Sequence, residues 1–475
     1  MRISLSKSAG GRLALTAGSL LALAVVLIFV YRTACGCGDA ETRPPRAATD
    51  AAGWGLYDPD PAHVWNRLYR SLHSRVARDG REFGRDELDP LLWQSTNHLL
   101  GGPSNREATE RLGEFLEARA EHLVKDPLRR AVLQRDLWAV FDWTVRRNDN
   151  KHPPEVRALQ SRLAKVIRRL TLTPAQAGAL PDNYAAAVAS GKFAADFDPA
   201  RPDAPFLPPD LLRPDGAWVQ LGVAGVEAVA AAPSHVFSAD GRSVFRVLIS
   251  LPRGREATLA YLKSVAEFPR PWVRDRRRGG DPQPNPRLPQ FPPGTRLALV
   301  RQMLVVDDRG EPTPTAVTES VQIRVHRAIP VEIPEGFNLD RDDARAALSV
   351  YEFRLGRERL FAGEAGGLRA VARDEAEFPL FSSHGIDLFE SEGGSFGPLE
   401  RHLRPVLGSC TSCHFRPGIH SMLSRMPDML QLRVRDVRRD LSPAPDPARE
   451  ASLTRDWKMR RESWRLLREL WEEKQ

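Results

Sequence analysis

The hydrophobic periodicity of this chain changes once, at a proline-rich stretch near its middle. Residues 198–216 read DPARPDAPFLPPDLLRPDG, and prolines lack the backbone N–H that a continuing helix needs. Apolar residues follow a helical period of about 3.6 before this stretch and alternate after it. We therefore predict an α+β protein of several domains, with a linker at residues 198–215.

The part before the linker predicts an N-terminal helical bundle over residues 63–197. Its first helix has one apolar face, made by Trp65, Leu68, Tyr69, Leu72 and Val76. Capping and proline signals predict further helix starts at Ser104 with Glu107, Asp126-Pro127, Pro153-Pro154 and Thr173-Pro174. Inward-facing stripes are expected from Leu112, Phe115, Leu116 and Leu123, and from Leu133, Leu137, Val140 and Phe141.

The part after the linker predicts a central β-rich domain over residues 216–375. Alternating apolar and polar residues indicate strands at 243–251, 296–306 and 317–327, and around Tyr351 to Leu355. A single helix is expected near residues 256–268, followed by a proline-rich loop at 269–294. Helical crossovers are scarce, which favours a mostly antiparallel sheet.

Charge and motifs exclude several function classes. The formal net charge is +8, but four of the cations precede Cys35 in a stretch without acidic residues. No basic patch with interleaved aromatic residues follows, so we predict no nucleic-acid partner. The central 300 or so residues show no phosphate loop, serine-hydrolase motif or zinc-protease motif. We interpret His235 and His326 as ordinary surface or core residues.

The N-terminal segment, residues 1–37, predicts export. Residues 13–31 carry no charge and follow three cations, and about 20 apolar residues cross a bilayer. The segment is either a retained transmembrane anchor or a cleaved signal peptide. In both cases the bulk lies in the cell envelope, on the periplasmic or extracytoplasmic side, after a polar tether at residues 38–62.

Cys35 and Cys37 follow the apolar run directly, in TACGCGDA. A small residue before a cysteine resembles a bacterial lipoprotein signal, but Arg32 stands where that signal has an aliphatic residue. Lipidation at Cys35 and an inert or disulfide-bonded pair both stay open. With two further cysteines in more than 400 residues, the chain is no disulfide scaffold.

The other two cysteines lie in the pentad Cys410-Thr-Ser-Cys413-His414. C-x-x-C-H is the attachment site of c-type haem. Two thiols on one helical turn can add to the two vinyl groups of one porphyrin, and the adjacent histidine can present its imidazole to the iron. A C-x-x-C disulfide, a redox dithiol and another metal site are the alternatives.

In this pentad the chain resembles the c-type cytochromes, over at most its last 100 residues, 376–475. The resemblance implies one covalent haem c, with Cys410 and Cys413 as the thioether cysteines and His414 as the proximal ligand. We expect a small helical haem segment, with helices at 398–409 and through the evenly spaced Trp457, Trp464 and Trp471.

The second axial ligand is less defined by the sequence. The resemblance implies a methionine some tens of residues beyond the motif, whereas Met426-Pro427 follows His414 by 12 positions. Met426 and His420 are the candidates, and further residues of suitable chemistry are Met422, Met459, His384 and His402. A histidine would give a lower reduction potential than a methionine, and a vacant position would admit small ligands.

These observations together predict an exported, membrane-tethered mono-haem cytochrome that transfers single electrons to an unidentified redox partner protein. Electron transfer is favoured over enzymatic activity, and we assign no catalytic residue. One alternative is an envelope interaction protein with a C-x-x-C disulfide. The other is a peroxidase-like haem enzyme, although the di-haem peroxidases need two such motifs and this chain has one.

Overall fold

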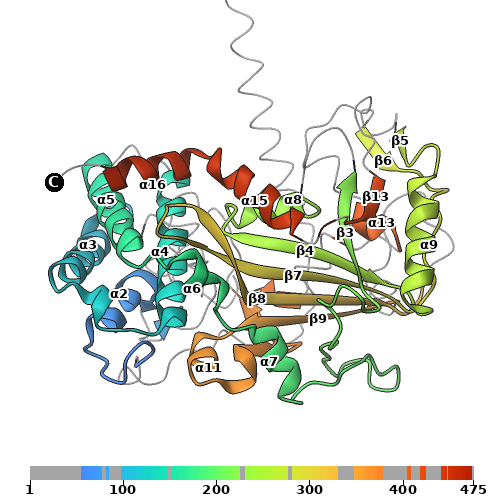
Figure 1. Ribbon diagram of the computed structural model, residues 1–475, viewed down its shortest axis with the longest axis horizontal. Coiled ribbons are helices and arrows are strands. Elements are labelled where there is room, and N and C mark those ends of the chain that lie inside the picture. The colour runs from blue at the N-terminus through green and yellow to red at the C-terminus, as the bar shows by residue number, and fades with distance from the viewer. Residues whose placement is uncertain are drawn as a thin grey trace, which may run out of the picture. The chain divides into compact units, whose positions relative to one another are not determined.

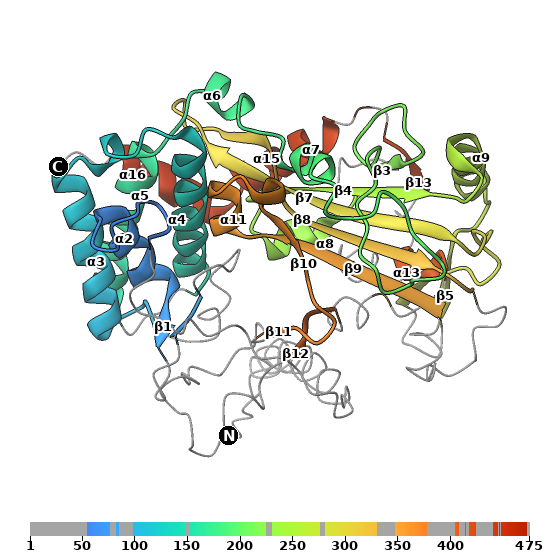
Figure 2. The same cartoon turned by 90° about the horizontal axis from the view of Figure 1, so that it is seen from below.

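A long antiparallel sheet forms the β-rich part of the protein (Figures 1 and 2). Among the described residues it has seven strands in the order β10-β9-β8-β7-β4-β3-β13, and all neighbours are antiparallel. The strands are β3 (Val219–Ala224), β4 (Ser243–Ser250), β7 (Thr295–Val306), β8 (Pro312–His326), β9 (Leu348–Leu355), β10 (Leu368–Ala370) and β13 (Asp440–Pro443). The predicted α+β class with a mostly antiparallel sheet is confirmed.

The computed structural model describes most of the chain between residues 55 and 472. The described residues are 55–76, 82–84, 98–147, 152–224, 230–275, 281–329, 347–377, 404–407, 414, 418–423, 440–444, 446 and 448–472. All of them belong to one packed unit, Pro44–Gln475. The predicted domain boundaries within that unit stay predictions.

The hairpin β7–β8 lies at the centre of the sheet. The turn between its strands explains where β8 begins. The Asp307 carboxylate accepts hydrogen bonds from the backbone N–H groups of Arg309 and Glu311, at 3.0 and 2.9 Å. Gly310 has a φ of 75°, a conformation that side chains with a Cβ rarely adopt. Because this tight turn follows β7 directly, β8 begins at Pro312. The alternation of apolar residues predicts a later start, at residue 317.

One face of the sheet is apolar and covered by α6 (Pro174–Gly178), α7 (Asn183–Ala189) and the proline-rich stretch. The stretch was expected to be a linker, at residues 198–215. Instead, its Phe206, Leu207 and Leu211 are buried in the same cluster as the sheet residues. Apolar side chains between the prolines therefore hold this stretch on the sheet.

The opposite face of the sheet packs against helices from three separate parts of the sequence. These are α8 (Pro233–Ser238), α9 (Gly254–Ala266), and two C-terminal helices, α13 (His420–Leu423) and α15 (Arg449–Met459) (Figure 1). Phe245 and Val247 of β4 point to this face and contact α8 and α15. The C-terminal helices α13 and α15 thus lie on the sheet.

The helical part packs beside one end of the sheet (Figure 2). It consists of α2 (Val64–His73), α3 (Gly102–Glu117), η3 (Ala120–His122), α4 (Pro127–Arg147), α5 (Pro153–Arg169) and α16 (Glu462–Glu472). The remaining short elements are β1 (Arg75–Val76), β2 (Glu82–Phe83), β5 (Trp272–Asp275), β6 (Asp281–Pro284), α11 (Arg357–Phe361), η5 (Glu364–Gly367), β11 (Ala376–Glu377) and β12 (Arg404–Pro405).

Helix α4 joins the helical part to the sheet because its polar side chains are buried together with its apolar ones. The Gln134 amide forms two hydrogen bonds with the backbone of Val306, both 2.8 Å, and so extends the strand ladder sideways. Arg135 pairs with Glu319 at 3.1 Å. The four apolar residues predicted to face inward, Leu133, Leu137, Val140 and Phe141, are buried. The polar residues on the other sides of α4 are buried as well, which the predicted apolar stripe does not include.

The last turns of α4 carry a deeply buried ion cluster. Asp142 Oδ2 accepts hydrogen bonds from Lys458 Nζ at 2.6 Å and from Arg242 Nη1 at 2.7 Å. Burial alone would raise the pKa of Asp142, but the two cations hold it below its ordinary value. Burial lowers the pKa of Lys458 to about 8.

Two helix-start predictions have different outcomes. Thr173 caps α6 and forms a capping box with Gln176, which confirms the start at Thr173-Pro174. The predicted capping box at Ser104 is wrong, because α3 already begins at Gly102, with Pro103 in its first turn. The predicted inward position of Leu123 is also wrong, since this side chain is 55% exposed.

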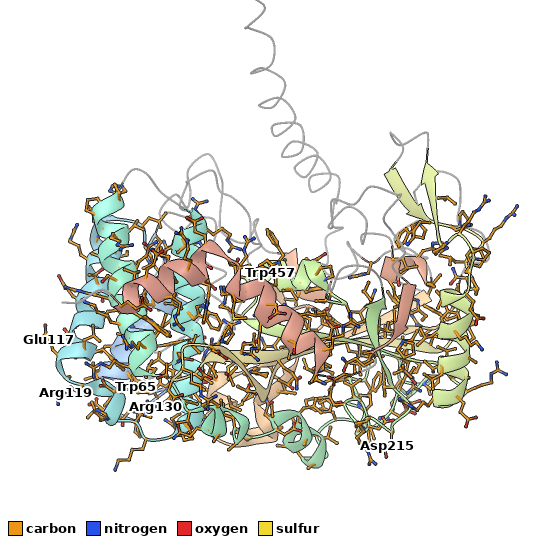
Figure 3. The ribbon with its side chains drawn as sticks, turned by 45° about the horizontal axis from the view of Figure 1, so that its top comes forward. Trp65, Glu117, Arg119, Arg130, Asp215 and Trp457 are labelled. Atoms are coloured by element: carbon orange, nitrogen blue, oxygen red, sulfur yellow. The ribbon has the colours of Figure 1, made fainter. Side chains whose placement is uncertain are left out.

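The C-terminal predictions also need correction. The expected tryptophan helix is two helices, α15 and α16, separated at Arg460 and Arg461. Trp457, labelled in Figure 3, therefore contacts Phe237 of α8, whereas Trp464 packs on Trp138 of α4. In the expected helix at 398–409, residues 404–405 form β12 and residues 406–407 are helical, whereas 398–403 and 408–409 lie outside the described residues. The expected loop 269–294 contains the hairpin β5–β6.

The transmembrane prediction is corrected as well. Among the helices of the described residues, none is long and apolar enough to cross a membrane. The predicted segment 13–31, like Cys35 and Cys37, lies outside those residues.

Replacing Asp142 tests the buried ion cluster. Asp142→Asn removes the carboxylate that pairs with Lys458 and Arg242 and leaves Arg242 with Asp240 at 3.4 Å, and losing one partner of a buried ion pair costs about 3–5 kcal/mol. We expect urea unfolding to show a loss of this size. The matched control is Asp215→Asn (Figure 3), because the Asp215–Arg213 pair is 72% and 65% exposed and exposed pairs contribute little to stability. Equal losses in both variants would contradict a structural role of the cluster.

Candidate functional site

The residues of the haem motif are described only in part. His414 belongs to the described residues, whereas Cys410, Cys413 and Met426 lie outside them. His420, the other candidate ligand, begins α13 and is 2% exposed. The geometry around His414 is therefore what the structure contributes to this site.

A backbone carbonyl orients the imidazole of His414. His414 Nδ1 lies 2.7 Å from the carbonyl oxygen of Ser421 in α13. The oxygen can only accept, so we assign the proton to Nδ1, which donates this hydrogen bond. The other ring nitrogen, Nε2, is then unprotonated, and an unprotonated imidazole nitrogen is the type of atom that binds a metal.

The segment that supplies this carbonyl is itself attached to the sheet. Ile419 and Leu423 are buried in a cluster with Ile249, Leu297 and Phe291. The backbone N–H of Ile419 donates to Gln290 Oε1 at 2.9 Å. Gly418 has a φ of 58°, and a Cβ there would lie 2.0 Å from the same oxygen. Glycine is therefore required at this contact, which fixes α13 and the Ser421 carbonyl.

A second histidine faces His414 from a distant part of the sequence. His235 lies on the short helix α8, whose first turn holds Pro233. Its ring centroid is 6.5 Å from that of His414, and the two ring planes differ by 7°. The sequence predicts an ordinary residue at His235, because its surroundings, APSHVF, show no spacing that links it to the motif.

The surroundings of His235 are aromatic and cationic. The centroid of its ring lies 5.4 Å from the ring centroid of Phe245 on β4. The guanidinium carbon of Arg301 lies 5.7 Å from the centroid of the same Phe245 ring. Burial lowers the pKa of His235 to about 4, and Arg324 and Arg301 add to this effect. His235 is therefore neutral near pH 7, the state in which imidazole binds metals.

The other candidate ligands have different environments. Met459 is 40% exposed at the end of α15, and Met422 packs partly buried on the cluster around Leu297. His384 and His402 lie outside the described residues. The structure thus brings together His235 and His414, a pair that sequence reasoning missed.

The expectation of a metal-binding protein also receives a correction. Within the part of the chain that the structure describes, no group of three or more His, Cys, Asp or Glu side chains could hold a metal ion. A metal site built from such a cluster is therefore not supported. Haem iron is a separate case, because the porphyrin supplies four ligands and the protein one or two.

A surface cavity of about 810 Å³ lies on the helical part, and Glu117 and Arg130 of its lining are labelled in Figure 3. Arg130 donates to the backbone carbonyls of Arg169 and Thr171, and Arg169 pairs with Glu121 at 3.3 Å. These cations hold neighbouring helices together.

Comparison with known proteins gives no match: no protein-family model, curated protein or solved structure is similar to this chain.

The second histidine interpreted as ordinary, His326, should make the stability of the protein depend on pH. Burial, with a smaller contribution from Arg324, lowers its pKa from 6.5 to about 3. The unfolded state therefore binds more protons between these values, and stability rises with pH across this window. We expect His326→Gln to flatten the pH dependence of the unfolding free energy by up to about 1.4 kcal/mol per pH unit. Urea unfolding at a series of pH values measures this, and an unchanged slope would contradict it.

Proposed function

We propose that the protein is a c-type cytochrome that carries one covalent haem and transfers single electrons outside the cytoplasm. Cys410 and Cys413 would hold the porphyrin through thioether bonds, and His414 would bind the iron. The observation that carries this proposal is the 2.7 Å hydrogen bond from His414 Nδ1 to the Ser421 carbonyl.

This hydrogen bond matters because a metal-binding histidine needs a fixed tautomer and ring orientation. Ligating histidines commonly donate their second ring N–H to a carbonyl or carboxylate, which also makes the ligating nitrogen more basic. His414 has such a partner at Nδ1, which supports its proposed role as the iron ligand through Nε2.

When bound, the haem supplies a centre that gains and loses one electron. The chain's own residues would do the rest. His414 and its carbonyl partner would set the axial position, and Arg301 and Arg324 would favour the reduced state through their positive charge. The redox partner would be another protein that docks near the haem edge.

The finer architecture is part of the same proposal. We propose a helical part over residues 63–197, a β-rich part over 216–375 and a C-terminal haem segment over 376–475. In the described structure α13 and α15 lie on the same sheet face as α8, which supports a haem segment that docks on the sheet.

The test is covalent haem attachment in the protein produced by export with a haem-maturation system. We expect the reduced protein to show a sharp c-type α-band and an intact mass increased by one haem. Cys410→Ala/Cys413→Ala should lose both signals, because no thioether bond can form. The matched control, Cys35→Ser/Cys37→Ser, should keep them.

Other outcomes would favour the alternatives. A colourless protein of unmodified mass would contradict the proposal and favour an interaction protein with a C-x-x-C disulfide. Covalent haem together with turnover of hydrogen peroxide would favour a peroxidase-like enzyme over an electron-transfer protein.

A further inference from the structure

We propose that the surface cavity on the helical part binds a small anion that also carries a hydroxyl group, either a hydroxycarboxylate or a polyol phosphate. The cavity is lined by residues of α3, η3, α4, α5 and α16, which pack beside one another at one end of the sheet (Figure 1). Lys165 and Arg168 would bind the acidic group, and Glu121 would accept a hydrogen bond from the hydroxyl. Such binding needs no haem, so it can be tested separately from the proposed function.

The size and the walls of the cavity suit a small organic molecule. Its volume is about 810 Å³, and ligand pockets typically measure roughly 300–1,000 Å³. Hydrogen bonds fix the wall that α16 contributes: Trp471 Nε1 donates to the carbonyl oxygen of Ala164 at 2.7 Å, and the Arg168 guanidinium donates to the carbonyl oxygen of Trp471. The cavity therefore lies between helices that are joined to each other.

Positive charge predominates in the lining. The basic side chains are Arg130, Lys165, Arg168 and Arg169, together with His122, and the acidic side chains are Glu117 and Glu121. Lys165 has no hydrogen-bond or ion-pair partner within the part of the chain that the structure describes. Because an excess of cations in a cavity attracts anions and raises their local concentration, the ligand should be anionic.

A buried carboxylate makes this cavity more than a basic surface. The Glu121 side chain is 4% exposed, and its Oε1 pairs with Arg169 Nη1 at 3.3 Å. Its Oε2 is buried and accepts no hydrogen bond from any described residue. Arg130 Nε, in the same lining, is also buried and without a hydrogen-bond partner among those residues. Buried polar atoms without a partner are unfavourable, so both atoms favour a ligand that can supply one.

A hydroxyl group satisfies both atoms, because it donates one hydrogen bond and can accept others. The Glu121 carboxylate needs a donor, and Arg130 Nε needs an acceptor. Glu121 raises the pKa of Arg130 against the larger lowering by burial, so the two groups interact. The acidic group of the ligand would be repelled by Glu121 and would lie at Lys165 and Arg168, which are less buried.

Isothermal titration calorimetry of the full chain, near neutral pH and at low salt, tests this binding with two matched pairs of probes. Citrate and tricarballylate carry the same carboxylates, and of the two only citrate has a hydroxyl. Glycerol phosphate and propyl phosphate carry the same phosphate, and only the former has free hydroxyls. We expect the hydroxylated member of at least one pair to bind about tenfold more tightly, the effect of one hydrogen bond to a charged group. The pair that shows this preference identifies the acidic group as carboxylate or phosphate.

Three variants locate the binding site. Lys165→Gln should weaken both members of that pair about tenfold, because it removes a cation without a structural partner among the described residues. Lys263→Gln, the matched control, removes the same charge from α9, where the side chain is 74% exposed, and should leave binding unchanged. Glu121→Met keeps the length of the side chain without an acceptor, and should abolish the preference for the hydroxylated member.

The opposite results would overturn the proposal. Absence of binding by all of these probes at millimolar concentration would contradict it, and so would equal affinities within both pairs. An unchanged affinity in Lys165→Gln, or an equal loss in Lys263→Gln, would place the anion elsewhere on the protein. If circular dichroism shows that Glu121→Met does not fold, Lys165→Gln and the comparison within each pair still decide, because neither removes a buried contact.

Discussion

Asp142 lies between two buried cations, Arg242 and Lys458, and this contact ties together three parts of the protein that are far apart in the sequence. Asp142 belongs to α4 in the helical part, Arg242 directly precedes β4, and Lys458 lies in α15. Each group is almost fully buried, and a buried charge without a partner is strongly unfavourable. The helical part, the sheet and the C-terminal helices therefore cannot separate without leaving charges unpaired.

The candidate site depends on this contact because α8 leads into Arg242. The short turn through Gly241 connects the helix of His235 to the ion cluster, and α15 packs against the same turn. The segment of His414 reaches the same sheet face through Ile419 and Leu423. Two histidines from distant parts of the chain thus meet over one face of the sheet, and the packing beneath them explains why they stay there.

Local patterns predicted the elements, whereas distant contacts determined the site. The strands at 243–251 and 296–306 follow from alternation, and α6 follows from Thr173 and its proline, because these signals act over a few residues. No local signal predicts that Asp142 is buried, since its partners come from elsewhere in the chain. His235 escaped prediction for the same reason, whereas the motif at His414 is visible in five consecutive residues. The thioether roles of Cys410 and Cys413 stay predictions.

The most direct test is a crystal structure of the haem-loaded protein with anomalous diffraction recorded at the iron absorption edge. The iron position can then be compared with the His414 ring without reference to any variant. We predict one iron within bonding distance, about 2 Å, of Nε2 of His414. An iron bound elsewhere, or a protein without iron, would contradict the proposed cytochrome.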